Sequence, residues 1–339
     1  SLTTPGPIEL QALFHRMVQR RVEVCSMEVS SIALEQARTR GAYFKIGVFT
    51  NFTQDHLDYH HTMENYFEAK LKLFRDYEIP CVVVNLDDPQ STKVLSASKS
   101  SKQITFSINN KAASFYVLEA KFRKNGTLAK VQTPKGVMEI NSPLIGAHNL
   151  MNILGALGVV EGLGQDLIVA VRGLETAKGA PGRLERAVQG DYYPNVFVDY
   201  AHSDDALENV LKALHYLRGD SGGKIITVFG CGGDRDKIKR PKMAKVASYF
   251  SDVTIVTSDN PRTEDPESIL NDIESGIDRT KTEYHREVNR RQAICLALKM
   301  AKAEDIVLIA GKGHENYQII GTQKQDFDDK QVVKDFYSA

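Results

Sequence analysis

The chain has 339 residues, of which 42% are hydrophobic and 25% charged, a composition typical of a globular protein long enough for two domains. Lysine plus arginine and aspartate plus glutamate each number 43, so the formal net charge is zero, which disfavours a general nucleic-acid or acidic-membrane binder. No apolar run approaches the length of about 18 residues that a spanning helix needs. Four scattered cysteines are typical of core residues in a reducing compartment. We therefore expect a cytoplasmic protein.

The first hundred residues alternate helical patterns with short β-rich runs. A helical stretch occupies residues 8–21, and β-rich runs occupy 22–29 (VEVCSMEV), 44–51 (FKIGVFTN) and 79–88 (IPCVVVNLDD). This alternation predicts a parallel sheet covered by helices. From about Ser101 the runs become strand and hairpin patterns, with Asn125-Gly126 as a type I′ turn signal. We expect an antiparallel patch there.

A helical stretch at 149–164 is followed by a Gly- and Pro-punctuated linker near residue 180. Four apolar runs follow, at 195–200, 224–230, 252–258 and 305–311, with helical patterns between them. The sequence therefore predicts two α/β domains, 1–178 and 179–339, the second of them Rossmann-like.

Each of the four apolar runs ends in a polar loop. The loops read DYAHSDD (199–205), GCGGDRDKIKR (230–240), SDNPR (258–262) and GKGHE (311–315). In an open α/β sheet the carboxyl ends of parallel strands lie at one edge, where ligands bind. Because solvated turns usually carry charge, one such loop would mean little, but four predict a common polar site.

Phosphate-binding motifs are missing from these loops. The chain contains no GxxxxGK[ST] sequence, and GCGGDRD has Arg235 where the third glycine of a dinucleotide-binding GxGxxG would stand. A nicotinamide-dependent dehydrogenase is therefore a disfavoured alternative.

Lys70 is an unusual residue of the predicted helix that begins near Thr62. It falls on the apolar stripe formed by Met63, Tyr66, Phe67, Leu71 and Phe74. Such a lysine usually packs its stem and extends its ammonium to water. Alternatively, burial makes it a neutral nucleophile or a carbamate precursor. The spacing does not choose between these.

Glu28 and His56 each follow a predicted strand, Asp55 precedes His56, and hard oxygen ligands with an imidazole suit Mg²⁺ bound together with phosphate. A capping carboxylate and a loop histidine are the alternative interpretations.

Nine segments, in order, resemble the Mur ligases of bacterial peptidoglycan synthesis, and within them the branch that adds the third amino acid. They are LTTPGPIELQ, MEVSSIALEQAR, FTNFTQDHLDYHHTMENYFEAKLKLF, GAHNLMNILGA, GRLERA, VDYAHSDDALENVL, FGCGGDRDKIKRPKM, SDNPR and GKGHE. The resemblance implies a P-loop-type central domain followed by a Rossmann-like carboxyl-terminal domain. It also implies an ATP- and Mg²⁺-dependent amide ligase that acts on small molecules as a monomer.

The resemblance assigns roles to residues of this chain. Glu28 and His56 match metal-binding positions, and Lys70 matches a carbamylated lysine that completes the metal site. The positions that match the nucleotide site are Asn149, Asn152, Arg183 and Asp199. Those that match the UDP-muramoyl-dipeptide site are Thr3, Thr4, Ser30, Gln36 and Arg38. Those that match the amino-acid site are Arg235, Asp259, Asn260, Arg262, Gly311 and Glu315.

The Asp-Asn-Pro-Arg sequence resembles the form of this motif used for meso-diaminopimelate, because Arg262 can pair with a distal carboxylate. L-Lysine addition, or a non-catalytic amino-acid-binding relative, are the alternatives.

The chain also departs from the family pattern. Ile32 replaces a usual His, His61 a usual Gly, and Ser203-Asp204 a usual Thr-Pro. The family's phosphate loop and amino-terminal domain would precede residue 1, so we expect the 339 residues alone not to catalyse ligation.

Overall fold

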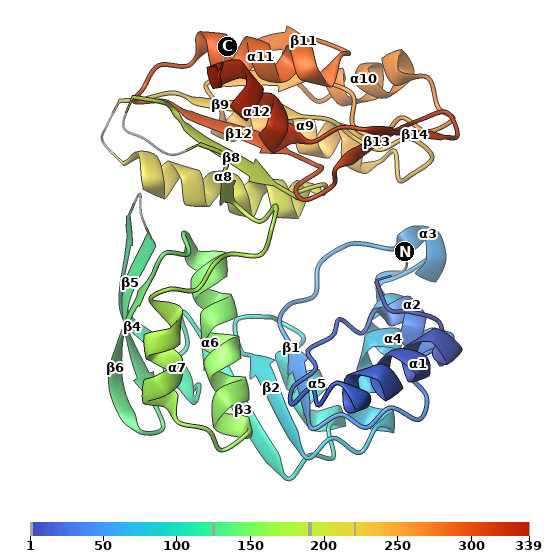
Figure 1. Cartoon of the computed structure of the whole chain (residues 1–339), viewed down its shortest axis with the longest axis vertical. Helices are drawn as coiled ribbons and strands as arrows, with labels where there is room; N and C mark the ends of the chain where they lie inside the picture. Colours follow the sequence, from blue (N-terminus) through green and yellow to red (C-terminus); the bar gives the residue numbers. More distant parts are fainter. Residues whose placement is uncertain (1–2, 124–125, 189–191, 220–221, 339) are drawn as a thin grey trace. The chain divides into compact units, whose positions relative to one another are not determined.

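The computed structural model describes residues 3–123, 126–188, 192–219 and 222–338, in two compact units (Figure 1). Unit 1 comprises Ser1–Ala120, Ala129–Ile140 and Leu150–Leu174, and unit 2 comprises Lys121–Leu128, Asn141–Asn149 and Glu175–Ala339. The predicted division between residues 178 and 179 stays a prediction. No helix of the described residues is long and apolar enough to cross a membrane.

The first sheet is built from a mostly parallel half and a hairpin half. Its strand order is β1-β2-β3-β4-β5-β6, and the pairs from β1 to β4 are parallel. Because β5 and β6 are hydrogen-bonded neighbours joined by two residues, they run antiparallel. The strands are β1 (Ile46–Phe49), β2 (Cys81–Asn85), β3 (Lys102–Ser107), β4 (Phe115–Arg123), β5 (Gly126–Thr133) and β6 (Gly136–Ser142).

Helices accompany this sheet, as the alternating pattern predicts. One core joins helix α4 to the sheet through Phe67, Leu71 and Phe74, which pack with Val82 and Val84. On α6, glycine allows close approach, since a Cβ at Gly158 would lie 2.7 Å from a methyl carbon of Val83. The helices are α1 (Pro7–Gln19), α2 (Ser31–Glu35), α3 (Leu57–His60), α4 (Met63–Asp76), α5 (Ser91–Ala97), α6 (Ala147–Gly162) and α7 (Leu167–Leu174).

Two expectations for this region are wrong. Residues 22–29 form no strand: among the described residues they take part in no sheet, and Val24 is 70% exposed, so they have no hydrogen-bonded ladder to stabilise an extended conformation. The antiparallel patch begins at β4, since β3 pairs in parallel with β2 and β4. Asn125, half of the expected turn, lies outside the described residues. Cys25 is exposed, although Cys81 and Cys231 are buried as expected.

Unit 2 contains the second sheet, in the order β11-β10-β9-β12-β8-β7, whose strands are parallel except for the antiparallel pair β7–β8. The four apolar runs form β8, β9, β10 and β12, so the α/β prediction is confirmed. The strands are β7 (Glu185–Arg186), β8 (Asn195–Asp199), β9 (Ile225–Phe229), β10 (Val253–Val256), β11 (Glu283–Arg286), β12 (Ile306–Ala310), β13 (Tyr317–Ile320) and β14 (Gln323–Asp326).

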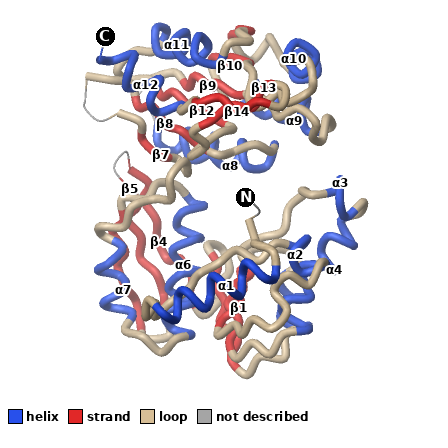
Figure 2. The backbone as a smooth tube through the Cα atoms, turned by 45° about the vertical axis from the view of Figure 1, so that its right-hand side comes forward, coloured by secondary structure: helices blue, strands red, loops and turns tan. Residues whose placement is uncertain are grey.

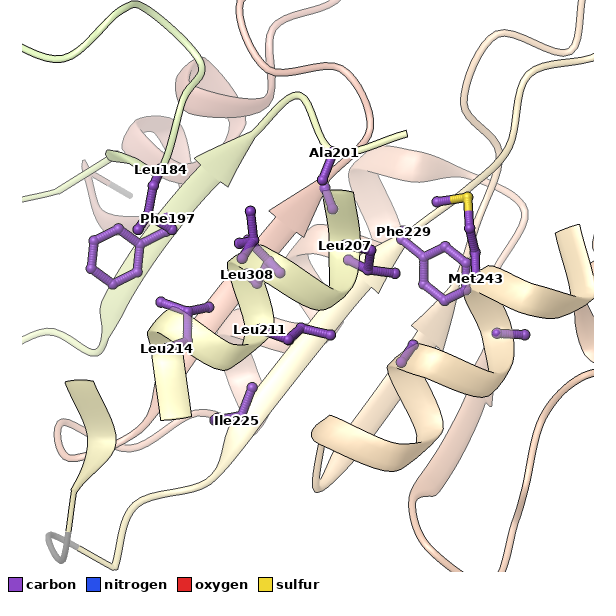
Figure 3. Close-up of a cluster of buried hydrophobic side chains, with 14 of the residues drawn as sticks. Leu184, Phe197, Ala201, Leu207, Leu211, Leu214, Ile225, Phe229, Met243 and Leu308 are labelled. Atoms are coloured by element: carbon purple, nitrogen blue, oxygen red, sulfur yellow. The ribbon is translucent and has the colours of Figure 1, made fainter. Parts of the chain in front are cut away.

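Helices cover both faces of this sheet (Figure 2). Alternate strand residues face opposite layers: Phe197 belongs to the core that includes Leu211 and Leu214 of α8 (Figure 3), whereas Val196 and Val198 belong to the core that includes Ala293 of α11. The β13–β14 hairpin, which the sequence analysis did not anticipate, forms a separate two-stranded sheet. The helices are α8 (Asp204–Arg218), α9 (Lys239–Phe250), α10 (Pro266–Glu274), α11 (Arg290–Met300) and α12 (Asp329–Ser338).

Candidate active site

The carboxyl ends of β9, β10 and β12 bring three of the predicted loops together. The loop after β9 packs directly on the loop after β10, because a Cβ at Gly233 would lie only 1.9 Å from the carbonyl oxygen of Pro261. The backbone N–H of Gly233 donates to the carbonyl of Asn260 at 2.9 Å. Only glycine permits this approach. The predicted common polar site in unit 2 therefore exists as a set of touching loops.

The centre of this site is a buried lysine between three oxygen acceptors. Lys312 is 0% exposed, and its Nζ lies 3.5 Å from Oδ1 of Asp259, 3.1 Å from Oδ1 of Asn260 and 3.1 Å from Oε2 of Glu315. Asn260 also donates through Nδ2 to Oε2 of Glu315 at 2.9 Å. Burial alone would raise the pKa of Glu315, but these hydrogen bonds and the Lys312 charge hold it below its ordinary value. We call these four side chains the acidic receptor.

Sequence reasoning missed Lys312, although it stands inside GKGHE. The signal was a lysine directly after a buried strand and between two glycines, whose φ angles are +115° at Gly311 and +53° at Gly313. A Cβ at Gly313 would lie 2.7 Å from Cβ of Tyr200, so the tight turn depends on glycine.

The β13–β14 hairpin borders the acidic receptor. The backbone N–H of Ile319 donates to Oδ1 of Asn260 at 2.9 Å, and the Tyr317 hydroxyl donates to Oε1 of Glu315 at 3.3 Å. The Arg262 N–H donates to the carbonyl of Ile319 at 3.1 Å. The hairpin therefore fixes both the receptor and the Asp-Asn-Pro-Arg loop.

Arg262 lies at the junction of these loops. Its backbone has a φ of +54°, which costs conformational energy for a residue with a side chain. Its Nη1 donates to the carbonyls of Gly233 at 2.8 Å and Asn260 at 3.4 Å, and among the described residues Nε and Nη2 have no hydrogen-bond partner, so they can donate to a ligand. Arg235, on the same loop as Gly233, is exposed and has no recorded contact with the acidic receptor.

A second buried cation, Arg240, bonds to residues of two of these loops, the loop after β9 and the loop after β10. Its side chain is 0% exposed and donates to both oxygens of Glu264 (2.8 and 2.7 Å), to Asp272 (2.8 Å) and to the carbonyl of Gly232 (3.2 Å). Those bonds hold the pKa of Glu264 far below its ordinary range. Glu264 also accepts from the N–H of Asp234 at 3.1 Å.

Two of the predicted nucleotide residues lie around β7 and β8. Asp199 is buried and its two carboxylate oxygens accept from the N–H groups of Leu184 (2.6 Å) and Ala201 (2.7 Å). Burial nevertheless raises its pKa. The Arg183 guanidinium lies 5.0 Å from the ring centre of Tyr200. Asp199 thus fixes the backbone at Leu184, the residue next to Arg183.

On α6, Asn149 donates to the carbonyl of Ile145 at 2.9 Å, and Asn152 follows one turn later. His148 is a neighbour that sequence reasoning missed, because a lone histidine in a helix gives no signal. Burial, with the positive charge of Arg183, lowers its pKa to about 4, so His148 is neutral at neutral pH.

In unit 1 the structure gathers most of the predicted dipeptide-binding residues. The Thr4 hydroxyl donates to the carbonyl of Glu28 at 2.9 Å and accepts from the N–H of Ser30 at 3.0 Å. Arg38 donates to the carbonyl of Thr4 at 3.1 Å and to Oε1 of Gln36 at 2.8 Å. Thr3 is exposed, with no recorded bond to this group.

The predicted metal residues meet around Tyr66. Helix α4 begins after Thr62, whose hydroxyl accepts from the N–H of Asn65 at 3.1 Å, as its sequence predicts. Lys70 Nζ then lies 5.0 Å from the Tyr66 ring centre, and the His56 ring packs edge-on against the same ring at 5.8 Å.

Electrostatics favour the desolvated interpretation of Lys70. Burial lowers its pKa, although the nearby negative charges of Glu28 and Asp55 act in the opposite direction. Among the described residues no three His, Cys, Asp or Glu side chains form a metal-binding group. The carboxylates suit Mg²⁺ that takes its remaining ligands from phosphate, and the set fits better with Lys70 as an anionic carbamate than as a cation.

The comparisons with known proteins agree along nearly the whole chain. The description "Mur ligase middle domain" matches residues 1–160, and "Mur ligase, glutamate ligase domain" matches residues 182–313. A UDP-N-acetylmuramoyl-L-alanyl-D-glutamate–2,6-diaminopimelate ligase of Trichormus variabilis is 45% identical over 98% of this chain and 66% of its own length. The enzyme of the same name from Bacillus licheniformis is 45% identical, over 98% of this chain and 68% of its own length.

Solved structures agree with these matches. A structure of an enzyme with that name is 38% identical and has a TM-score of 0.68, over 99% of this chain and 69% of the other. MurF of Acinetobacter baumannii, at 17% identity and a TM-score of 0.66 over 87% of this chain and 60% of its own, shares the fold. The chain thus spans about two thirds of the length of these curated relatives, from 66% to 68%. With both domain descriptions matched in order and relatives of this similarity, the chain belongs to the Mur ligase family.

Proposed function

We propose that the full-length protein is an ATP-dependent ligase that joins meso-diaminopimelate to UDP-N-acetylmuramoyl-L-alanyl-D-glutamate. The observation that carries the proposal is the acidic receptor beside Arg262. Carboxylates accept from an ammonium group, while a guanidinium pairs with a carboxylate. An amino-acid centre carries both groups on one carbon, so this site presents the complement of both. Relatives named for diaminopimelate support the choice of ligand.

Amide formation between a carboxylate and an amine in water requires an activated carboxylate. In the proposed reaction the side-chain carboxylate of the D-glutamate attacks the γ-phosphorus of ATP and ADP leaves. The neutral amine of diaminopimelate then attacks the acyl phosphate, the amide C–N bond forms, and phosphate and a proton leave. Arg183 and Asp199, with Asn149 and Asn152, are the residues that we assign to the nucleotide. Thr3, Thr4, Ser30, Gln36 and Arg38 are those that we assign to the UDP-linked dipeptide.

Glu28, His56 and Lys70, as a carbamate, are the residues that would hold Mg²⁺ in this scheme. When bound, the ion would offset the negative charge of the phosphates. Burial of Lys70 favours the neutral amine that carbamate formation needs. We also propose that the protein acts in the cytoplasm, as a monomer.

The test is steady-state kinetics on the full-length protein with meso-diaminopimelate and with L-lysine. We expect faster turnover with diaminopimelate. Arg262→Ala should raise the KM for diaminopimelate about 10- to 100-fold, the value of a charge-assisted hydrogen bond, with the KM for ATP unchanged. Arg286→Ala is the matched control, because Arg286 of the same unit pairs with Glu267 and Glu274 instead. Faster turnover with lysine, or an unchanged KM in Arg262→Ala, would overturn the assignment.

A further inference from the structure

We propose that Lys312 is a positioning residue that makes Asp259, Asn260 and Glu315 a single receptor for the ammonium group of the amino-acid substrate. The inference rests on the proposed function and deepens it. Lys312 reaches no substrate atom in this scheme. It acts by fixing the orientation and the charge of the groups that do.

The N–H donors of Lys312 match the acceptors around it. A lysine ammonium has three N–H donors, and the three nearest acceptors of Lys312 belong to three different side chains of the acidic receptor. The Nζ atom therefore uses its donors inside the receptor, and at 0% exposure the side chain does not reach solvent. A lysine whose only task was solubility would extend its ammonium to water. The buried ammonium of Lys312 instead orients these oxygens.

Lys312 also determines the net charge of the acidic receptor. Asp259 and Glu315 both lie within 3.5 Å of the same nitrogen atom. Two carboxylates so placed repel each other, and a cation between them offsets that repulsion. Lys312, Asp259 and Glu315 together carry one formal negative charge. That charge matches one ammonium group of a ligand, and the oriented oxygens determine where it binds.

A buried ion pair, Arg290–Asp329, supports the backbone next to the receptor. Arg290 is 0% exposed, pairs with Asp329 at 2.8 Å and donates to the carbonyl of Ala310 at 3.0 Å, two residues before Lys312. This pair is formally neutral, so it supports the backbone that presents Lys312 without cancelling the receptor's charge. Lys312 is thus the cation that sets the charge of the receptor.

The experiment replaces Lys312 in the full-length protein. Lys312→Met keeps the apolar stem and removes the charge, and we expect the KM for diaminopimelate to rise about 10- to 100-fold, with the KM for ATP within about twofold. Lys312→Gln, which retains N–H donors without the charge, should show the same increase and serves if the Met variant does not fold. Lys212→Met is the matched control, because Lys212 of the same unit is 52% exposed and pairs with Glu208 of α8 instead. Its KM values should stay within about twofold of the wild-type values.

Chemical rescue separates a charge effect from a packing effect. Lys312→Ala should regain activity toward diaminopimelate with added propylammonium, which replaces the missing atoms and charge, and should not regain it with propan-1-ol. An unchanged KM in the neutral variants, an equal rise in the KM for ATP, or equal rescue by the alcohol would overturn this inference alone. A wild-type protein without diaminopimelate-dependent ADP formation would overturn the proposed function, and this inference with it.

Discussion

The two groups of candidate site residues differ in how firmly the protein itself holds them. In unit 2 three members of the acidic receptor are buried and Glu315 is partly buried, and each member bonds to another member or to the β13–β14 hairpin. In unit 1 the side chains of His56 and Asp55 are 43% and 51% exposed, and Nε2 of His56 lies 3.7 Å from Oδ2 of Asp55. The first group is complete without a ligand, whereas the second is only loosely assembled.

Backbone strain shows the same contrast. Arg262 and His56 both have φ angles of +54°. Arg262 is held on both sides, since its N–H donates to Ile319 and its carbonyl accepts from Gly321 at 2.7 Å. The His56 N–H donates to Asp55 at 2.8 Å and its carbonyl accepts from Tyr59 at 3.1 Å and from His60 at 2.9 Å, so its partners are close neighbours along the chain, whereas those of Arg262 come from the β13–β14 hairpin. A preorganised site loses little conformational entropy when a ligand binds, whereas a loose one depends on the ligand to order it. The difference agrees with the proposed ligands, a small amino acid in unit 2 and a phosphate-bound cation in unit 1.

The largest expected effect is the loss of stability when the buried Arg290–Asp329 pair of unit 2 is broken. Arg290→Met leaves Asp329 buried and unpaired, and should lower the free energy of unfolding of unit 2 by about 3–5 kcal/mol. Arg291→Met, at the next position, removes a pair with Asp335 whose side chains are 53% and 47% exposed, and should cost at most about 0.5 kcal/mol. Urea unfolding of the full-length variants measures both. Equal losses would contradict the contrast between buried and exposed pairs.

The second prediction concerns the free energy of unfolding of unit 2 at acid pH. The folded-state pKa of Glu264 lies below its ordinary value of 4.5, because Arg240 donates to both its oxygens. Its stabilisation is therefore complete above pH 4.5 and is lost as the pH falls toward the folded-state pKa. After allowance for solvent screening near the exposed Lys237, we expect a loss of about 1 kcal/mol by pH 3.

Urea unfolding of unit 2 at pH 7 and pH 3 provides the measurement. Glu264→Gln should be less stable than the wild type at pH 7 and should lose less on acidification. A variant with the same acid response as the wild type would show that other carboxylates dominate.

The sequence was a good guide to unit 2 because its strands are continuous apolar runs and their loops carry the charged motifs. It failed at Lys312, since a loop lysine is usually solvated, and only the fold shows that glycine turns place it between Asp259 and Glu315. It failed also at residues 22–29, whose β-rich composition is insufficient without a neighbouring strand. Around Lys70 the helical spacing was right, because Tyr66, Phe67, Leu71 and Phe74 are buried. The departures from the family pattern are partly explained as well: Ser203 caps α8 by accepting from the N–H of Ala206 at 3.3 Å.

The smallest expected effect concerns strain in the loose region. His61 has a φ of +67° with a ψ of −38°, which is unfavourable for any residue with a Cβ. Relief of that strain is worth about 1–3 kcal/mol, and the greater freedom of glycine in the unfolded chain offsets about 0.5–1 kcal/mol of it. His61→Gly should therefore stabilise unit 1 by about 1 kcal/mol. His61→Ala, which removes the imidazole but keeps the Cβ, should bring no gain, and thermal unfolding distinguishes the two. If Ala stabilised unit 1 as much as Gly, the imidazole and not the backbone would be the source of the cost.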